Sequence, residues 1–432
     1  MIVSLTIKNI LSFRDKTFIS FEAGKEKLNS SSLAVVKKLH KKINSLECIF
    51  GPNASGKSNL FKVIGFIKNL VLRRNIPGSL TGVIPFRLDL THPNENSYFK
   101  IEFIVTNDWL YSYEVTLNST EIIEEILSFR NSQGCKLIYK RENSNIKFFD
   151  IGKILGTKKT LINIIKTSVQ ANQLVLNFFN SINLNEFAVI TNAYNWFKKI
   201  ILITPDEGFL PFLSKDNMEQ SVICGMLREY GVNIDKIKLI DYPKENLPVP
   251  LQEQLKDLPA TECIGGITND KDFVIAYIKD GALQTKKICT LHNTIENKLV
   301  SFDFSSESDG TKRLIELSPI LLALTFNSKK GFIFLIDEID RSLHTVLTKT
   351  IIKRFLAKRN NDSRIQMVIT CHDALMIDPK TFRLDQMWIC SKDDETKSSL
   401  FRRMNEIPGV RTDKDLLKYY LEGKLGGIPK LQ

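Results

Sequence analysis

Residues Gly51 to Ser58, GPNASGKS, have the residue types and spacing of a phosphate-binding loop. Glycine at positions 51 and 56 permits backbone angles at which successive N–H groups turn toward phosphate oxygens. Lys57 is long enough to reach the terminal phosphates, and the Ser58 hydroxyl is a suitable magnesium ligand. A plain glycine turn between a strand and a helix is the alternative, and the complete spacing disfavours it. We therefore predict a nucleotide site here.

A second chemical signal is the pair of acids Asp337 and Glu338, which directly follows the apolar run FIFLI. Open α/β sheets bind ligands beyond the carboxyl ends of their strands. At such a place Asp337 can hold the water shell of magnesium, and Glu338 can polarise an attacking water. Two adjacent acids after a strand can arise by chance. Together with a phosphate loop, however, they predict ATP hydrolysis rather than nucleotide binding alone.

Two further segments fit a phosphate site. Ser308-Asp309-Gly310-Thr311 opens an apolar-periodic helix, where a hydroxyl and a glycine N–H can face an anion. A plain helix cap is the alternative. His372 follows another apolar strand, 34 residues after Glu338, and there an imidazole can contact a γ-phosphate. One phosphate loop and a separate phosphate-sensing helix start predict two subunits that sandwich ATP.

The elements that must position these residues alternate between strand and helix. Residues 2–7 and 46–50 are predicted to be strands and residues 57–72 a helix, with antiparallel strands over 82–150. Segments 185–202 and 217–232 have helical patterns. Short strands return at 271–305. The last third alternates apolar strands with a helix over 343–356, which is typical of a parallel α/β sheet.

The predicted fold class is α/β, with a mixed sheet interrupted by an inserted lobe of antiparallel strands and helices. Four parts are expected: the N-terminal part of the head with the phosphate loop at 1–80, antiparallel strands completing the head at 81–155, a helical inserted lobe at 156–262, and the C-terminal part of the head at 263–432.

Composition narrows the classes of protein further. The chain has 432 residues, with 43% hydrophobic and 25% charged residues, and contains no run of apolar residues long enough for a membrane span. Its seven cysteines include no C-x-x-C pair, which predicts reduced thiols in a cytoplasm. The net charge of +12 suggests a polyanion, with nucleic acid as the first candidate. The charge is spread over small groups, so a lysine-rich background explains it equally well: Lys37, Lys38, Lys41 and Lys42, then Arg73–Arg74, Lys158–Lys159 and Lys329–Lys330.

The order GPNASGKS, SDGT, LIDEIDRSLH and TCHD resembles the ATP-binding-cassette (ABC-type) heads of the SMC and RecF class. The opening IKNILSFRD, the segment IPFRL and the ending YYLEGKLGGIP narrow the resemblance to the RloA-like group of AAA-annotated abortive-infection ATPases in bacteria. The resemblance implies heads that dimerise on ATP and Mg²⁺, with higher oligomers also open. It also implies a role in defence against phage beside a toxic effector partner.

The resemblance also assigns roles to residues. Asp337 supports the metal together with Ser58, Glu338 is the general base and His372 is the switch. Ser308 and Gly310 contact ATP held by the other subunit, Asp340 lies in the loop that crosses the dimer interface, and Arg14 is a candidate for the adenine side. The phosphate-loop residues implied to bind the nucleotide are Asn53, Ala54, Ser55, Gly56, Lys57, Ser58 and Asn59.

Some features depart from the cassette pattern. Asp309 stands where a second glycine is usual and Glu307 where a leucine is usual, so the signature is a variant. The glutamine with which cassette heads sense magnesium cannot be placed.

Two other functions compete with defence. A DNA-repair or chromosome-maintenance ATPase has the same head with a DNA-binding lobe. A nuclease would need an acidic metal centre, but the run KDDE at Lys392–Glu395 is predicted to be a solvated turn, so the nuclease is rejected. The glycine-rich tail, Tyr419 to Pro429, is expected to pack back on the head, with a simple helix cap as the alternative.

Overall fold

The computed structural model describes residues 1–26, 29–73, 76–105, 108–149, 159–181, 187–205, 217–255, 263–326, 331–359 and 362–428. By its contacts the chain divides into two units. The first contains Met1–Leu202, Ser328–Asp337 and Arg359–Gln432, and the second contains Ile203–Asn327 and Glu338–Lys358. Several residues named in the sequence analysis lie outside the described ranges, namely Arg74, Lys158, Lys329, Lys330 and Pro429.

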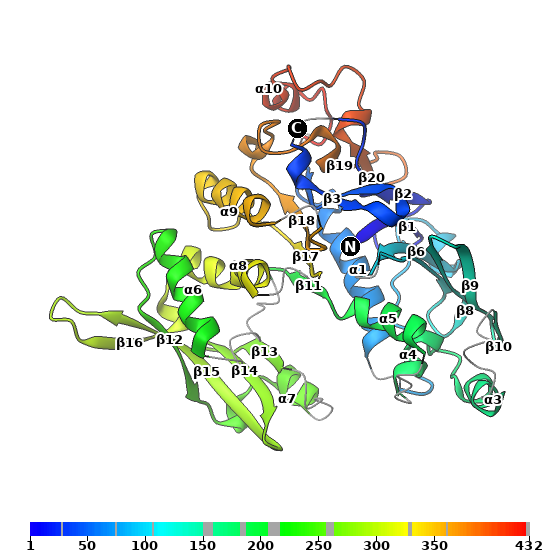
Figure 1. The fold of residues 1–432 in the computed structure, drawn as a ribbon, viewed down its shortest axis with the longest axis horizontal. Helices are drawn as coiled ribbons and strands as arrows, with labels where there is room; N and C mark the ends of the chain where they lie inside the picture. Colours follow the sequence, from blue (N-terminus) through cyan, green and yellow to red (C-terminus); the bar gives the residue numbers. More distant parts are fainter. Residues whose placement is uncertain are drawn as a thin grey trace. The chain divides into compact units, whose positions relative to one another are not determined.

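The first unit contains an antiparallel sheet with the strand order β10-β9-β8-β7-β6-β1-β2 (Figure 1). Side chains along β6 and β7 alternate between buried and partly exposed positions, as expected where one face of a sheet covers a core. The strands of this sheet are β1 (Ile2–Lys8), β2 (Thr17–Ser20), β6 (Ser97–Ile104), β7 (Leu110–Leu117), β8 (Ile122–Asn131), β9 (Gly134–Glu142) and β10 (Asn145–Phe148).

A second sheet, in the order β11-β17-β18-β5-β19-β20, carries the motifs of the sequence analysis. Strand β18 pairs in parallel with β17 and with β5, and β5 pairs in parallel with β19. The last pair, β19 with β20, is antiparallel, so the sheet is mixed. The strands are β5 (Leu46–Phe50), β11 (Ile200–Ile203), β17 (Ile333–Ile336), β18 (Gln366–Cys371), β19 (Met387–Lys392) and β20 (Ser399–Arg403).

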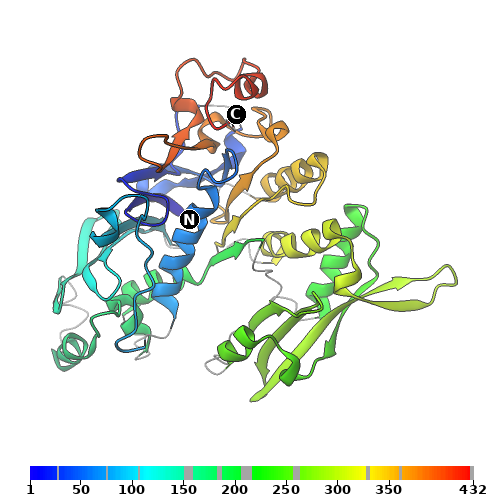
Figure 2. The ribbon, with the colours of Figure 1, turned by 180° about the vertical axis from the view of Figure 1, so that it is seen from behind.

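Helix α1 (Lys57–Leu72) joins these layers through its apolar side. It buries Leu60, Ile64, Ile67 and Val71 at spacings of three and four residues in the same core cluster as the antiparallel strands. Both views of the ribbon show α4 and α5 beside α1 (Figures 1 and 2). The other helices described before β11 are α3 (Lys159–Ser168), α4 (Val175–Ser181) and α5 (Ala188–Phe197).

A buried carboxyl group ties helix α4 to the antiparallel sheet. Glu125 on β8 accepts hydrogen bonds from the hydroxyls of Tyr113, at 2.8 Å, and Tyr139, at 2.6 Å. It also accepts the backbone N–H groups of Val175 and Leu176, at 2.7 and 3.1 Å, in the first turn of α4. The carboxyl group therefore lies at the N-terminal end of the helix and satisfies otherwise unpaired donors there.

The second unit is built on an antiparallel sheet in the order β12-β15-β14-β13, with β16 paired to β15. Helix α8 packs against α6 and α9. The elements of this unit are α6 (Asn217–Glu229), β12 (Lys236–Asp241), α7 (Val249–Leu255), β13 (Cys263–Ile267), β14 (Phe273–Lys279), β15 (Ala282–Asn293), β16 (Leu299–Asp303), α8 (Asp309–Phe326) and α9 (Thr345–Lys358).

The predicted fold class is confirmed, since the described chain is α/β with mixed sheets. The predicted strands at 2–7 and 46–50 and the helix at 57–72 are also confirmed. The contact units do not follow the four predicted domain ranges, which stay a prediction. Helices α3 to α5 fall in the first unit, and strands β13 to β16 fall in the second.

The helical prediction for residues 185–202 was wrong at its end, because Ile200–Ile203 form strand β11. The apolar run KIIL fits a helix or a strand equally well. It forms a strand because it pairs with β17 at the edge of the mixed sheet. Strand β12 (Lys236–Asp241) likewise lies inside the stretch 156–262 that was predicted to be helical. None of the helices in the described ranges has the length and hydropathy needed to cross a membrane.

Candidate nucleotide-binding site

At two positions, the loop between β5 and α1 has a backbone conformation and surroundings that fit only glycine. Gly51 has φ of 152°, and a Cβ atom there would lie 2.1 Å from the carbonyl oxygen of Cys390. Gly56 has φ of 106°, and a Cβ atom there would lie 1.9 Å from Oγ of Ser399. The two glycines are therefore required by close approach as well as by backbone angle.

Lys57 begins helix α1 and curls back over the loop. Its Nζ donates hydrogen bonds to the carbonyl oxygens of Gly51, at 2.7 Å, and Pro52, at 2.9 Å, and the residue is only 4% exposed. The ammonium group is therefore fixed beside the helix N-terminus, where an anion is also favoured by the helix dipole. Ser58 and Asn59 follow in the first turn of the same helix and are partly buried.

Two hydroxyl groups from distant segments support the loop from outside. Ser399, which begins β20, donates its hydroxyl hydrogen to the carbonyl oxygen of Ser55 at 2.6 Å, and its Oγ lies 2.7 Å from Oγ of Ser12, whose hydroxyl can donate to it. Burial raises the pKa of the Cys390 thiol to about 12, so this group stays neutral and donates to the same Ser55 carbonyl at 3.4 Å. The backbone turn at Ser55–Gly56 is therefore held in place by residues of β19, β20 and the first loop.

The carboxyl ends of β17, β18 and β5 lie side by side, because the three strands pair in parallel register. Ile336 is opposite Ile369, and Cys371 is opposite Phe50. The residues that follow these strands are Asp337, His372 and Gly51, respectively. The first unit therefore brings the phosphate loop, the metal-supporting acid and the switch histidine of the sequence analysis to one edge of one sheet.

Asp337 is held at this edge by a neighbour that the sequence analysis did not single out. The Thr370 hydroxyl, near the end of β18, donates to Oδ1 of Asp337 at 2.6 Å, and Asp337 is only 5% exposed. The pairing is a consequence of strand register, so the only sequence signal for it is the position of Thr370 just before His372. His372 itself is exposed.

Glu338 belongs to the second contact unit, and its backbone is held in a rare conformation. Its φ is 50°, in the left-handed region that residues other than glycine seldom adopt. Its carbonyl oxygen accepts from Nη2 of Arg313 at 2.9 Å and from the backbone N–H of Arg341 at 3.0 Å. Arg313 and Arg341 in turn bind Oε2 of Glu316, at 3.0 and 3.2 Å. Strained backbone that is held in place by surrounding contacts is common at functional positions.

The predicted signature segment caps helix α8. Oγ of Ser308 accepts the backbone N–H of Thr311 at 3.1 Å, so the cap considered as the plain alternative is present. Ser308 is nevertheless exposed, and a Cβ atom at Gly310 would lie 3.1 Å from the carbonyl oxygen of Ser342. Glu307 faces inward instead, where it accepts from Nε2 of His292 at 2.6 Å. A capped, exposed helix start leaves the predicted phosphate contact open as a proposal.

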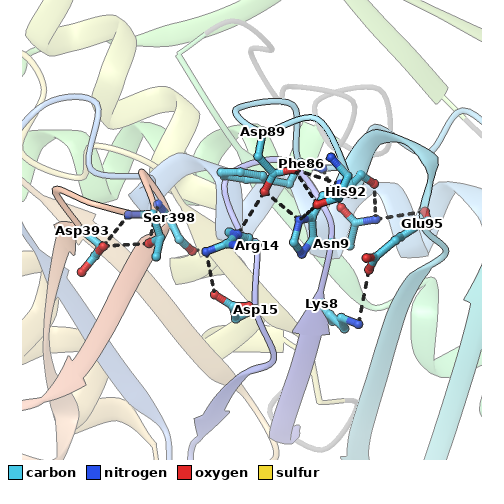
Figure 3. Close-up of polar contacts among 12 residues, drawn as sticks. Lys8, Asn9, Arg14, Asp15, Phe86, Asp89, His92, Glu95, Asp393 and Ser398 are labelled. Atoms are coloured by element: carbon cyan, nitrogen blue, oxygen red, sulfur yellow. Dashed lines mark hydrogen bonds and ion pairs between the residues drawn. The ribbon is translucent and has the colours of Figure 1, made fainter.

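Arg14 lies on the loop after β1, beside the carboxylates of Asp15 and Asp89 and the hydroxyl of Ser398 (Figure 3). Its Nε donates to Oδ2 of Asp89 at 3.0 Å, and its backbone N–H donates to Oγ of Ser398 at 3.2 Å. Despite partial desolvation, backbone and ring N–H groups of His92 hold the pKa of Asp89 down, at about 2. The motifs IKNILSFRD and IPFRL thus meet in the fold, because the Leu11 N–H donates to the carbonyl of Ile84 at 2.8 Å.

The described part of the tail packs on the mixed sheet, as predicted. After helix α10 (Leu416–Leu421), the hydroxyl of Tyr420 donates to the carbonyl of Gly427 at 2.7 Å. Leu425 is 1% exposed, and a Cβ atom at Gly427 would lie 2.7 Å from the side chain of Ile389 on β19.

The acidic run at Lys392–Glu395 lies in the turn between β19 and β20. Oδ1 of Asp393 accepts the backbone N–H of Thr396 at 2.7 Å, which is a local turn contact. Across the described ranges, no group of three or more His, Cys, Asp or Glu side chains is arranged to hold a metal ion. The turn contact agrees with the prediction of a solvated turn.

The residues at the sheet edge suit a nucleoside triphosphate with magnesium. Gly51 and Gly56 give the loop a backbone path with positive φ angles, and Lys57 supplies a fixed cation beside it. Inside the loop, the buried Oγ of Ser55 has no hydrogen-bond partner within the described residues. Hydroxyl and carboxylate oxygens such as those of Ser58 and Asp337 are the ligands that Mg²⁺ prefers. The fold and this edge define a P-loop nucleotide-binding protein.

A family model described as "AAA domain, putative AbiEii toxin, Type IV TA system" matches residues 47–378. The chain belongs to this family. Among curated proteins, a search finds no match.

Three solved structures are similar at low identity. The SMC head domain from Thermotoga maritima has a TM-score of 0.32 and 14% identity, over 93% of this chain and 98% of that chain. The Smc head domain with an extended coiled coil bound to the C-terminal domain of ScpA, from Pyrococcus furiosus, has a TM-score of 0.33 and 13% identity, over 98% and 99%. The recombination mediator protein RecF-ATPrS of the RecFOR pathway has a TM-score of 0.33 and 14% identity, over 93% and 98%. These likenesses are too distant to support an argument about function.

Proposed function

We propose that this chain is an ABC-type ATPase in bacterial anti-phage defence by abortive infection. In this proposal, ATP joins two or more copies and so controls a toxic effector partner in the cytoplasm. The observation that carries the ATPase part is the parallel register of β5, β17 and β18, which gathers Lys57, Asp337 and His372 at one sheet edge.

Each residue of the edge has a proposed task in hydrolysis. The loop from Asn53 to Asn59 binds the phosphates through its backbone N–H groups, and Lys57 binds a terminal phosphate oxygen. Magnesium, held by Ser58 and by Asp337, would neutralise charge on the phosphates. Thr370 keeps the Asp337 carboxylate oriented through its 2.6 Å hydrogen bond. Glu338 takes a proton from the attacking water as general base.

Assembly follows from the exposed start of helix α8. Ser308 and Gly310 are proposed to contact the γ-phosphate of ATP held by a second copy, so that neither copy has a complete site alone. Asp340 would then lie at the contact between the copies. His372 is proposed to sense the γ-phosphate, and Arg14, oriented by Asp89, to lie on the adenine side. The glutamine that would couple the site to the rest of the chain stays unassigned.

The defence role rests on the family description, which names a toxin–antitoxin system, and on the motif order. A phage challenge tests it: cells that carry the gene together with its native neighbours should give fewer plaques than cells with an empty vector. A neighbouring toxin or nuclease gene should be needed for protection. Unchanged plaque formation across a broad phage panel, with the protein expressed, would contradict the defence role.

A DNA-repair or chromosome-maintenance ATPase is the second candidate, and the net charge of +12 is the observation that favours it. For this function, deletion of the gene should sensitise cells to DNA damage without any phage. A normal survival curve after ultraviolet irradiation, together with loss of phage protection, separates defence from repair.

The tail gives a prediction that separates assembly from nucleotide chemistry. Deleting Glu422 to Gln432 removes contacts to β19 and leaves the phosphate loop, so ATP affinity should stay largely unchanged while assembly or effector capture weakens. Fluorescence of a labelled ATP analogue and light scattering measure the two properties on the same sample. A thermal melt controls for unfolding, because Leu425 is buried. Collapsed affinity with intact assembly would place the tail in the nucleotide pocket.

A further inference from the structure

A basic β-hairpin precedes the phosphate-loop strand in the first unit. It comprises β3 (Leu33–Val36), a short 3₁₀ turn at Lys37–Leu39 and β4 (Lys41–Asn44). The stretch from residue 29 to residue 46 contains no aspartate or glutamate. The cations of this hairpin are Lys37, Lys38, Lys41 and Lys42, with His40 at the turn. We call residues 33–44 the basic hairpin.

The frame of the basic hairpin is fixed on the first unit. Its inner side chains, Leu33, Ala34, Val36 and Ile43, are at most 4% exposed. Hydrogen bonds from and to other segments of the first unit also fix the backbone of the hairpin. Nη2 of Arg364 donates to the carbonyl of Val35 at 3.2 Å, and the backbone N–H of Asn44 donates to the carbonyl of Phe21 at 2.9 Å. Because the backbone of the hairpin is already fixed, a partner that binds its charged side chains does not have to order that backbone.

The charges of the basic hairpin are largely uncompensated. Lys41 pairs with Glu22 at 2.5 Å. Within the described ranges, Lys37, Lys38 and Lys42 are exposed and make no ion pair. Lysines that only block strand pairing lie along strand edges. Lys37 and Lys38 instead occupy the connecting turn, so edge protection does not explain them.

The chemistry of the hairpin selects a nucleic acid over a membrane. Surfaces that bind anionic lipid combine basic residues with apolar side chains that enter the bilayer. The basic hairpin has no exposed large apolar side chain among its described residues. Duplex nucleic acid carries about one negative charge per 1.7 Å of its axis, so several cations clustered in one turn can each reach a phosphate.

We propose that the basic hairpin binds the phosphate backbone of duplex nucleic acid, through Lys37, Lys38 and Lys42. Contacts with phosphates fix the position of a duplex but do not depend on its base sequence. The partner would therefore be recognised as a duplex of any sequence. This surface is separate from the phosphate loop, which lies at the opposite end of β5. The inference goes beyond the ATPase function and does not depend on the defence role.

Salt-dependent binding to a DNA duplex of about 30 base pairs tests this proposal by fluorescence anisotropy. Each lysine–phosphate contact contributes about 0.9 to the slope of log K against log salt. The triple variant Lys37→Gln/Lys38→Gln/Lys42→Gln should therefore reduce that slope by about 3 and weaken binding on the order of 10²-fold at 0.1 M salt. Its ATP hydrolysis should equal that of the unmodified protein, which shows that the variant is folded.

A matched control variant also removes three positive charges, but from the second unit. Lys236, Lys238 and Lys244 are exposed lysines of the second unit, and Lys236→Gln/Lys238→Gln/Lys244→Gln should leave the slope nearly unchanged. Equal losses in both triples would show a general charge effect and overturn the proposal. Full binding by the hairpin variant would also overturn it. Competition by polyglutamate as effective as unlabelled duplex, per charge, would indicate an acidic protein partner instead.

Discussion

Glu338→Gln should lower the rate of ATP hydrolysis by about 10²–10⁴-fold, the usual contribution of a general base, while ATP stays bound. The change removes the proton acceptor but keeps the shape of the side chain. The ligands proposed for the metal, Ser58 and Asp337, are untouched. The backbone contacts from Arg313 and Arg341 to the carbonyl oxygen of residue 338 do not involve the side chain and should persist. Phosphate release under saturating MgATP measures the effect.

The matched control for this variant is Glu395→Gln, which removes an exposed glutamate from the turn between β19 and β20. Its hydrolysis rate should equal that of the unmodified protein. Nucleotide retention, measured by filtration with labelled ATP, separates a lost base from a lost binding site. If Glu338→Gln hydrolyses ATP at the normal rate in steady state, Glu338 is not the base.

Lys57→Ala should remove ATP-dependent protection in cells and weaken ATP binding in solution. The Nζ atom of Lys57 donates to the carbonyls of Gly51 and Pro52, so it lies beside the loop and can also donate to a phosphate oxygen. Hydrogen bonds to charged groups contribute about 1.5–3 kcal/mol, so affinity should fall by about 10- to 150-fold. Isothermal titration with a slowly hydrolysed ATP analogue measures that fall, and plaque counts measure protection.

Three controls accompany Lys57→Ala. Lys62→Ala removes an exposed lysine from the same helix and should leave affinity and protection unchanged. Asp393→Ala and Asp394→Ala alter the acidic turn, and both should also protect cells normally. If the turn variants lose protection as fully as Lys57→Ala, the acidic run has a functional role, and the rejected nuclease mechanism has to be considered again.

The loop and its flanking elements were predictable because local sequence specifies them. The spacing of Gly51, Gly56 and Lys57 allows few backbone paths, and the apolar runs on either side have unmistakable strand and helix periods. Asp337 and His372 could be placed at the same edge from topology alone, because parallel strands align their carboxyl ends.

Long-range partners could not be predicted in the same way. The hydrogen bond from Thr370 to Asp337 depends on strand register, and the support of Ser55 by Ser399 joins residues 344 positions apart. Isolated serines and threonines carry no pattern that indicates such contacts. The hydrogen bonds of the Glu125 carboxyl group could not be predicted for the same reason, since its four donors come from β7, β9 and α4.

Short apolar runs were the other source of error. Ile200–Ile203 follow a helix without a break in hydrophobicity, and only pairing within the mixed sheet makes them a strand. The tail shows the opposite case. Its glycines suggested close packing, and Gly427 lies against Ile389 in the fold.

The mass of the Glu338→Gln protein with and without MgATP is the most direct test of an ATPase whose ATP-bound copies associate. Light scattering after size exclusion should give one copy without nucleotide and at least two copies with MgATP. Adding Ser308→Arg to Glu338→Gln should restore a single copy, because the exposed start of α8 is the proposed contact with the second copy's ATP. An unchanged mass with ATP demonstrably bound would contradict the account.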